Sequence, residues 1–121
     1  MALLNWPDFL ERVDNNKVLA LELAQDLLQA QVMRLERLET ALSTREHKAV
    51  EQASHAFRGL LAPYGPVPLL SALKALEESA RGKTLTSWEL PAEIREFLLV
   101  LRDEVTVEVA KLEEELKSFE G

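Results

Sequence analysis

The sequence predicts an all-α protein, specifically an antiparallel up-down four-helix bundle with a short N-terminal capping helix. Two long segments, near residues 17–42 and 91–118, carry apolar residues at steps of three, four and seven, the period of an amphipathic helix. Two shorter helices are expected between them, near 44–62 and 67–81. A chain of 121 residues can bury one core, so we expect a single domain spanning residues 1–121.

The first helix is expected near residues 7–13. The segment Asn5-Trp6-Pro7-Asp8 places proline in the first turn, where a helix does not need its missing N–H. Asp14-Asn15-Asn16 then supplies turn-forming residues and an N-cap for the second helix. We expect the short aromatic helix to cover one end of the bundle.

A leucine heptad marks the second helix, with Leu21, Leu28, Leu35 and Leu42 spaced seven residues apart. Such a heptad also fits a coiled-coil dimer. Further apolar residues widen the apolar arc beyond a two-stranded seam, namely Val18, Leu19, Leu23, Leu27 and Val32. We therefore expect these leucines to be buried inside the bundle of a monomer.

The third helix is predicted to begin at a capping box, with Ser43 as the N-cap and Glu46 three residues later. At about 100° per residue, Phe57 and Leu61 each lie within about 20° of Val50 around the helix axis. This stripe is expected to face the core.

His55 lies about 140° from that stripe, so its imidazole is expected to point outward. Gly59 follows one turn later at a cost of about 1 kcal/mol relative to alanine, which indicates that something other than helix stability favours it. A missing side chain there lets another surface approach the ring, and Arg58 adds a cation to the same patch. His47 is too distant from His55 to share a metal ion, and we expect it to be solvated.

The fourth helix follows a turn at Pro63 and Gly65, with Pro66 and Pro68 suited to its first turn. Gly82 is expected to end it. Its buried side is predicted to contain Leu69, Leu70, Leu73, Leu76 and Ala80.

Glu77 is expected at the height of His55, because His55 lies ten residues before Gly65 and Glu77 lies twelve after it in an antiparallel hairpin. Glu77 then either orients the imidazole or is an ordinary solvated carboxylate. Arg81, one turn further, either adds charge near this site or is equally incidental.

The last helix is expected to begin near Pro91, after a mainly polar loop. Its apolar stripe is predicted to contain Ile94, Leu98, Leu101, Val105, Val109, Leu112, Leu116 and Phe119. The run Glu113-Glu114-Glu115 is interpreted as a solvated end rather than a metal site.

The composition excludes several classes of function. A net charge of −7 argues against binding nucleic acid, and without cysteine the chain has no disulfide or thiol chemistry. No leader and no membrane-length apolar run are present, so we expect a cytoplasmic protein without membrane contact. Residues 45–83 contain six Lys/Arg and four Asp/Glu, a net charge of +2, which suits an acidic partner or a phosphoryl group.

Together, His55, a cation at plus three, Gly59 at plus four and Gly65 at plus ten resemble the histidine-containing phosphotransfer (HPt) domain of multistep two-component phosphorelays. The next helix continues the resemblance through Leu69, Leu73, Leu76, Glu77 and Arg81. The sequence departs from the pattern at Arg58, where lysine is commoner, at Leu60, which replaces a small residue, and at Pro63 in the turn.

The resemblance implies that His55 is the phosphorylated nucleophile, which accepts a phosphoryl group from the aspartate of one response-regulator receiver domain and passes it to another. The receiver brings Mg²⁺, so no cofactor or metal is expected in this chain, and a hybrid histidine kinase is a further expected partner. Arg58 would offset phosphoryl charge and Gly59 would permit docking. The chain has no Gly-rich nucleotide loop or kinase signature, so a phosphocarrier rather than an ATP-dependent kinase is expected.

Two alternatives stay open. The bundle could be an interaction or dimerisation module that works without phosphorylation, with His55 an incidental surface residue. It could also be a degenerate HPt domain that docks receivers without accepting phosphate, if Leu60 and Pro63 spoil the site.

Overall fold

A computed structural model describes residues 2–120, and it confirms the all-α prediction: these residues form helices joined by turns and loops, without a strand. The elements are α1 (Trp6–Arg12), α2 (Lys17–Thr44), α3 (His47–Leu61), the 3₁₀ helix η1 (Ala62–Tyr64), α4 (Val67–Arg81) and α5 (Ala92–Glu120). Helices α2 to α5 agree with the four predicted helices to within a few residues at each end.

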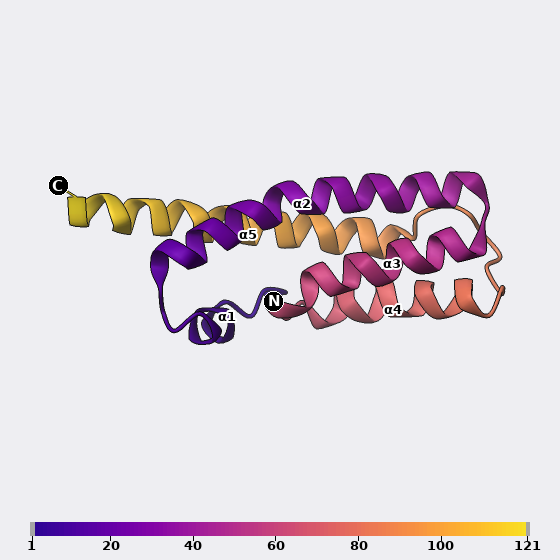
Figure 1. Ribbon diagram of the computed structural model, residues 1–121, viewed down its shortest axis with the longest axis horizontal. Coiled ribbons are helices and arrows are strands. Elements are labelled where there is room, and N and C mark those ends of the chain that lie inside the picture. The colour runs from indigo at the N-terminus through magenta and orange to yellow at the C-terminus, as the bar shows by residue number, and fades with distance from the viewer. Residues whose placement is uncertain (1, 121) are drawn as a thin grey trace.

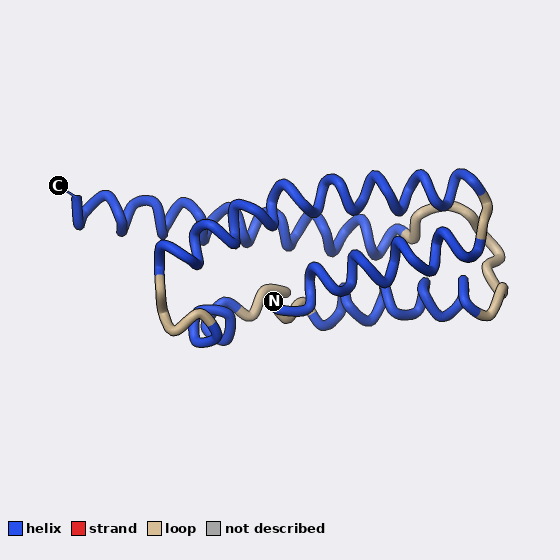
Figure 2. Tube along the Cα trace, in the orientation of Figure 1, coloured by secondary structure: helices blue, strands red, loops and turns tan. Residues whose placement is uncertain are grey.

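Helices α2 to α5 form an antiparallel bundle in which α2 packs against α3 and α5, and α4 packs against the same two helices (Figure 1). The short helices α3 and α4 therefore form one side of the bundle, and α2 and α5 form the other. Both long helices run past the turn of the α3–α4 hairpin, and α1 lies near that turn (Figure 2).

The core is apolar and continuous through the bundle. In α3, the predicted stripe of Val50, Phe57 and Leu61 is fully buried. The other helices contribute Phe9 from α1, Leu27 and Leu38 from α2, Leu69, Leu73 and Leu76 from α4, and Ile94, Leu98, Leu101, Val105, Val109 and Leu112 from α5. Phe119, predicted for the same stripe of α5, lies outside the residues whose side chains are described.

Three predicted turn signals are confirmed. Asn5 and Asn16 are N-caps, and their side-chain oxygens accept hydrogen bonds from the backbone N–H groups of Asp8 and Leu19. Gly65 ends η1 with a φ of 71°, a left-handed conformation that glycine adopts without strain.

The predicted capping box at Ser43 is wrong. Helix α2 continues to Thr44 and ends at Arg45, which takes a left-handed φ of 57°, and Glu46 is the N-cap of α3 without a side-chain hydrogen bond. The Ser43 hydroxyl donates to the Thr40 carbonyl one turn back at 2.7 Å. Because that hydroxyl is satisfied within its own helix, it does not cap the next one.

The predicted burial of the leucine heptad inside the bundle is complete for only one of its four members. Leu42 is buried, but Leu21, Leu28 and Leu35 are only partly buried. The side of α2 that faces the core instead contains Ala20, Ala24, Leu27, Gln31, Leu38, Ala41 and Leu42. The buried side of α2 thus contains small alanines as well as leucines, and three of the heptad leucines lie at its edge.

The expectation that His47 is solvated is also wrong. Its ring packs edge-on against Trp88, with ring centroids 4.7 Å apart, and its Nε2 atom is buried without a hydrogen-bond partner in the described part of the chain. Trp88 belongs to the connection between α4 and α5, so a loop distant in sequence covers this histidine.

The N-terminal segment is held to the bundle by polar contacts with distant residues. The Glu104 carboxylate accepts hydrogen bonds from the backbone N–H groups of Leu3 and Leu4 at 2.8–3.1 Å. Tyr64 stacks on Phe9 with ring centroids 4.7 Å apart, and its hydroxyl donates to the Leu23 carbonyl at 3.0 Å. The short helix therefore covers one end of the bundle, as predicted.

None of the helices described contains a stretch long and apolar enough to cross a lipid bilayer.

Candidate functional site

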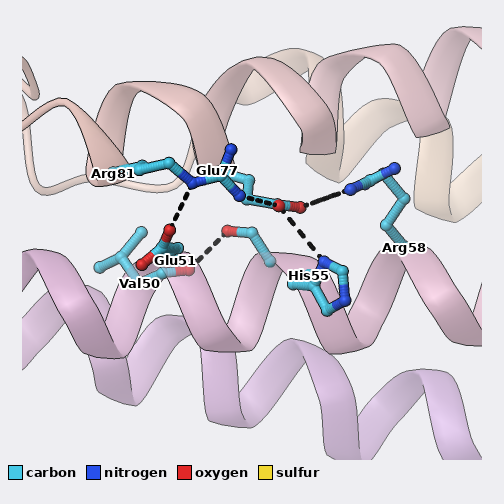
Figure 3. Close-up of polar contacts among 7 residues, drawn as sticks. Val50, Glu51, His55, Arg58, Glu77 and Arg81 are labelled. Atoms are coloured by element: carbon cyan, nitrogen blue, oxygen red, sulfur yellow. Dashed lines mark hydrogen bonds and ion pairs between the residues drawn. The ribbon is translucent and has the colours of Figure 1, made fainter.

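His55 lies on α3, and its imidazole is directed toward Glu77 of the neighbouring helix α4 (Figure 3). Its side chain is 70% exposed, which agrees with the outward direction predicted from helical geometry. Gly59 is also exposed, and a Cβ added there would have no heavy atom within 4 Å. Internal packing therefore gives no reason for glycine at this position.

Glu77 of α4 is a buried carboxylate in contact with this imidazole. Its side chain is only 3% exposed, and its Oε2 atom lies 3.2 Å from Nδ1 of His55. An ionised carboxylate can only accept hydrogen bonds, so this contact requires the proton of the imidazole to be on Nδ1. The other ring nitrogen, Nε2, is then left with its lone pair available.

Two arginines neutralise the buried carboxylate. Arg58 donates to Oε1 of Glu77 from Nε at 3.2 Å and from Nη2 at 2.8 Å, and Arg81 donates to Oε2 from Nη2 at 2.8 Å. Burial by itself raises the pKa of Glu77, but the hydrogen bonds from Arg58 and His55 and their charges lower it by more. The net effect is a lowered pKa, so Glu77 is a carboxylate at neutral pH.

The sequence reasoning missed Glu51, the fifth member of this cluster. Its carboxylate accepts a hydrogen bond from Nε of Arg81 at 2.6 Å, and this bond is the main reason that the pKa of Arg81 is raised (Figure 3). The count that predicted the His55–Glu77 contact would have found this one too. Glu51 lies fourteen residues before Gly65, and Arg81 lies sixteen residues after it. The two separations differ by two residues, as they do for His55 and Glu77.

The two arginines and two carboxylates carry no net charge as a group. Their hydrogen bonds fix Glu77, and Glu77 in turn fixes the ring of His55 at the surface. No group of three or more potential ligands able to hold a metal ion occurs among residues 2–120. Glu113, Glu114 and Glu115 are exposed, and Glu115 pairs with Lys17 at 2.8 Å.

The fold has a counterpart among solved structures. The chain is similar to the crystal structure of the HPt domain from a hybrid sensor histidine kinase of Shewanella, with a TM-score of 0.54 and 24% sequence identity over 96% of this chain and 95% of that one. The chain has the fold of an HPt domain. No protein-family model and no curated protein sequence matches it.

Two of the three departures from the HPt pattern, Leu60 and Pro63, are apolar residues outside the polar cluster around Glu77. Leu60 is partly buried and packs against the core. Pro63 is exposed within η1, and the turn still closes through a hydrogen bond from the Gly65 N–H to the Ala62 carbonyl at 3.2 Å. Neither residue has a polar contact with the cluster around Glu77.

Proposed function

We propose that this chain is a phosphocarrier of a two-component phosphorelay, in which His55 accepts a phosphoryl group from the aspartyl phosphate of a receiver domain and gives it to another receiver. The observation that carries the proposal is the contact between Nδ1 of His55 and the buried Glu77 carboxylate, which leaves Nε2 exposed as a nucleophile. The whole chain, residues 1–121, would act as one domain without ATP-dependent kinase activity.

In the transfer step, the Nε2 lone pair attacks the phosphorus atom, and the bond between phosphorus and the aspartate oxygen breaks. The electron pair of that bond stays on the aspartate, which leaves as a carboxylate. The new N–P bond gives the ring a positive charge, and the Nδ1–H of His55 remains hydrogen-bonded to the Glu77 carboxylate. Glu77 therefore stabilises the charge that develops during transfer.

The remaining site residues would assist through charge and access. Arg58, which is partly exposed, is placed to offset the charge of the incoming phosphoryl group, and Arg81 helps to hold Glu77 ionised. Gly59 leaves room for the receiver beside the ring. The Mg²⁺ needed for the reaction would belong to the receiver, so this chain would need no cofactor of its own.

Transfer of label from a phosphorylated receiver domain tests the proposal. We expect His55→Gln to abolish acceptance and His47→Gln, which removes the only other histidine, to leave it nearly intact. A phosphoramidate is lost in acid and survives alkali. Label that survives acid, or that persists in His55→Gln, would place the acceptor elsewhere.

A further inference from the structure

Helix α2 carries a line of five residues that are spaced symmetrically along the sequence about Leu28. Leu21 and Leu35 lie seven residues before and after Leu28, and Lys17 and Glu39 lie eleven residues before and after it. At 100° per residue all five fall within about 20° of one line along the helix. We call this set the α2 stripe. Its leucines are placed symmetrically, while its two ends carry opposite charges.

A groove beside the α2 stripe leaves apolar surface uncovered. Leu28 and Leu35 are only partly buried, Val32 between them is 47% exposed, and Leu99 of α5 is 52% exposed. The groove has a volume of about 210 Å³, and its walls are formed by Gln31, Val32, Leu35, Arg95, Leu98, Leu99 and Arg102. Gln31 also has a buried side-chain oxygen without a hydrogen-bond partner in the described chain.

The residues that line this groove belong to α2 and α5, which form the side of the bundle opposite α3 and α4, the helices that carry His55 and Glu77 (Figure 1). An occupant of the groove would therefore leave the candidate phosphorylation site open.

We propose that the occupant is a second copy of this chain, related by a two-fold axis that crosses α2 at Leu28, so that the two α2 helices run antiparallel. Leu21 then lies over Leu35 of the partner subunit, beside the groove, and Lys17 lies over Glu39 of the partner subunit. A two-fold interface must be complementary to itself, and the α2 stripe meets that condition in the spacing of its leucines and in the opposite charges at its two ends. An unrelated partner would have no need of this symmetry.

The size of the surface indicates a reversible dimer. The stripe from Lys17 to Glu39 is about 33 Å long at 1.5 Å per residue, and two helices side by side are about 20 Å wide. The contact would bury about 650 Å² per copy, or about 1,300 Å² in total, at the low end for specific interfaces. The monomer expected from the sequence depended on burial of these leucines within one chain, and most of them are not fully buried.

Sedimentation equilibrium over a range of concentrations, with a pair of adjacent substitutions, tests the proposal. Val32 lies about 40° from the line of the stripe, whereas Met33, 55% exposed, lies about 140° from it. We expect Val32→Glu to raise the dimer dissociation constant at least about tenfold and Met33→Glu to change it less than about twofold. Equal effects of the two substitutions, or a wild-type chain that stays monomeric up to about 1 mM, would overturn the proposal.

A charge exchange provides a second test. Lys17→Glu and Glu39→Lys should each weaken the dimer, and the double variant should recover most of the loss. Within one chain Lys17 pairs with Glu115 at 2.8 Å and Glu39 with Arg95 at 3.5 Å, so the double variant loses both of these pairs. Recovery is therefore expected only from contacts between copies, and its absence would contradict the two-fold arrangement. Phosphotransfer to Val32→Glu should be unchanged, which separates this inference from the proposed function.

Discussion

Replacing Gly59 with glutamine separates helix stability from access to His55. Gly59 lies inside α3, is exposed, and would present an added Cβ to open space, so the substitution removes the conformational cost of glycine without a clash. Glutamine is close to alanine in helix propensity, so the free energy of unfolding should rise by about 0.5–1 kcal/mol. For a chain of this size that gain corresponds to a rise of about 2–4 °C in melting temperature.

The same substitution should block a docking receiver. Side chains four residues apart on a helix have Cβ atoms about 5–6 Å apart, so a glutamine side chain at position 59 can extend over the His55 ring. Transfer from a phosphorylated receiver should fall at least about tenfold, equivalent to about 1.4 kcal/mol in the barrier. A small phosphodonor, which reaches Nε2 without a docking surface, should be much less affected.

Gly59→Ala is the matched control, because it gives the same or a slightly larger stabilisation with a single added methyl group. Its transfer rate should lie between those of the wild type and Gly59→Gln. Melting curves measure the stability of the two variants, and transfer rates measure the access of the receiver to His55. A lowered melting temperature in Gly59→Gln, or normal transfer from the receiver, would refute the argument that this glycine exists for docking.

Three further substitutions test other contacts. Glu77→Gln should cost about 1–3 kcal/mol at neutral pH, measured by urea unfolding, because it leaves Arg58 and Arg81 without their shared carboxylate. The folded-state pKa of Glu77 is lowered, so this decrease in the free energy of unfolding should be full above the usual carboxyl pKa of about 4 and should shrink as the pH falls below it. A decrease that does not depend on pH would count against an ionised Glu77. Glu104→Gln should increase hydrogen exchange of the Leu3 and Leu4 amides, whereas Glu108→Gln, one turn further on the same helix, should not; equal exchange in both would contradict the anchoring role of Glu104. Burial, followed by the charge of Asp26, raises the pKa of Tyr64, so the protein should lose stability as the pH rises above about 10, and Tyr64→Phe should remove that part of the loss; an unchanged alkaline profile would contradict it.

The parts of the site that could be predicted from the sequence depend on local geometry. His55 and its outward direction follow from the angular position of Val50, Phe57 and Leu61 on one helix. The contact with Glu77 follows from counting equal rise on both sides of Gly65, since the turn is short and the two helices are antiparallel. Glu51 was missed although the same count applies to it.

Two of the three predictions that the structure corrects depend on neighbours distant in sequence. The leucine heptad of α2 indicated which residues could be buried, but the side that faces the core is defined by contacts with α3 and α5, and it contains Ala20, Ala24 and Ala41. His47 was expected in solvent because the position of Trp88, forty-one residues later, cannot be obtained from periodicity. Ser43 had a local alternative partner in the Thr40 carbonyl, which a motif does not reveal.

The compactness of the α3–η1–α4 hairpin has a consequence for folding. His55, Glu77 and their charged neighbours all come from residues 51–81, and the two ends of the His55–Glu77 contact are separated by 22 residues. Contacts between residues close in sequence form rapidly, whereas α5 must return over a longer stretch of chain to close the bundle. The contact between His55 and Glu77 is therefore expected to form early in folding, and fraying of the ends of α2 and α5 beyond the hairpin would leave it intact.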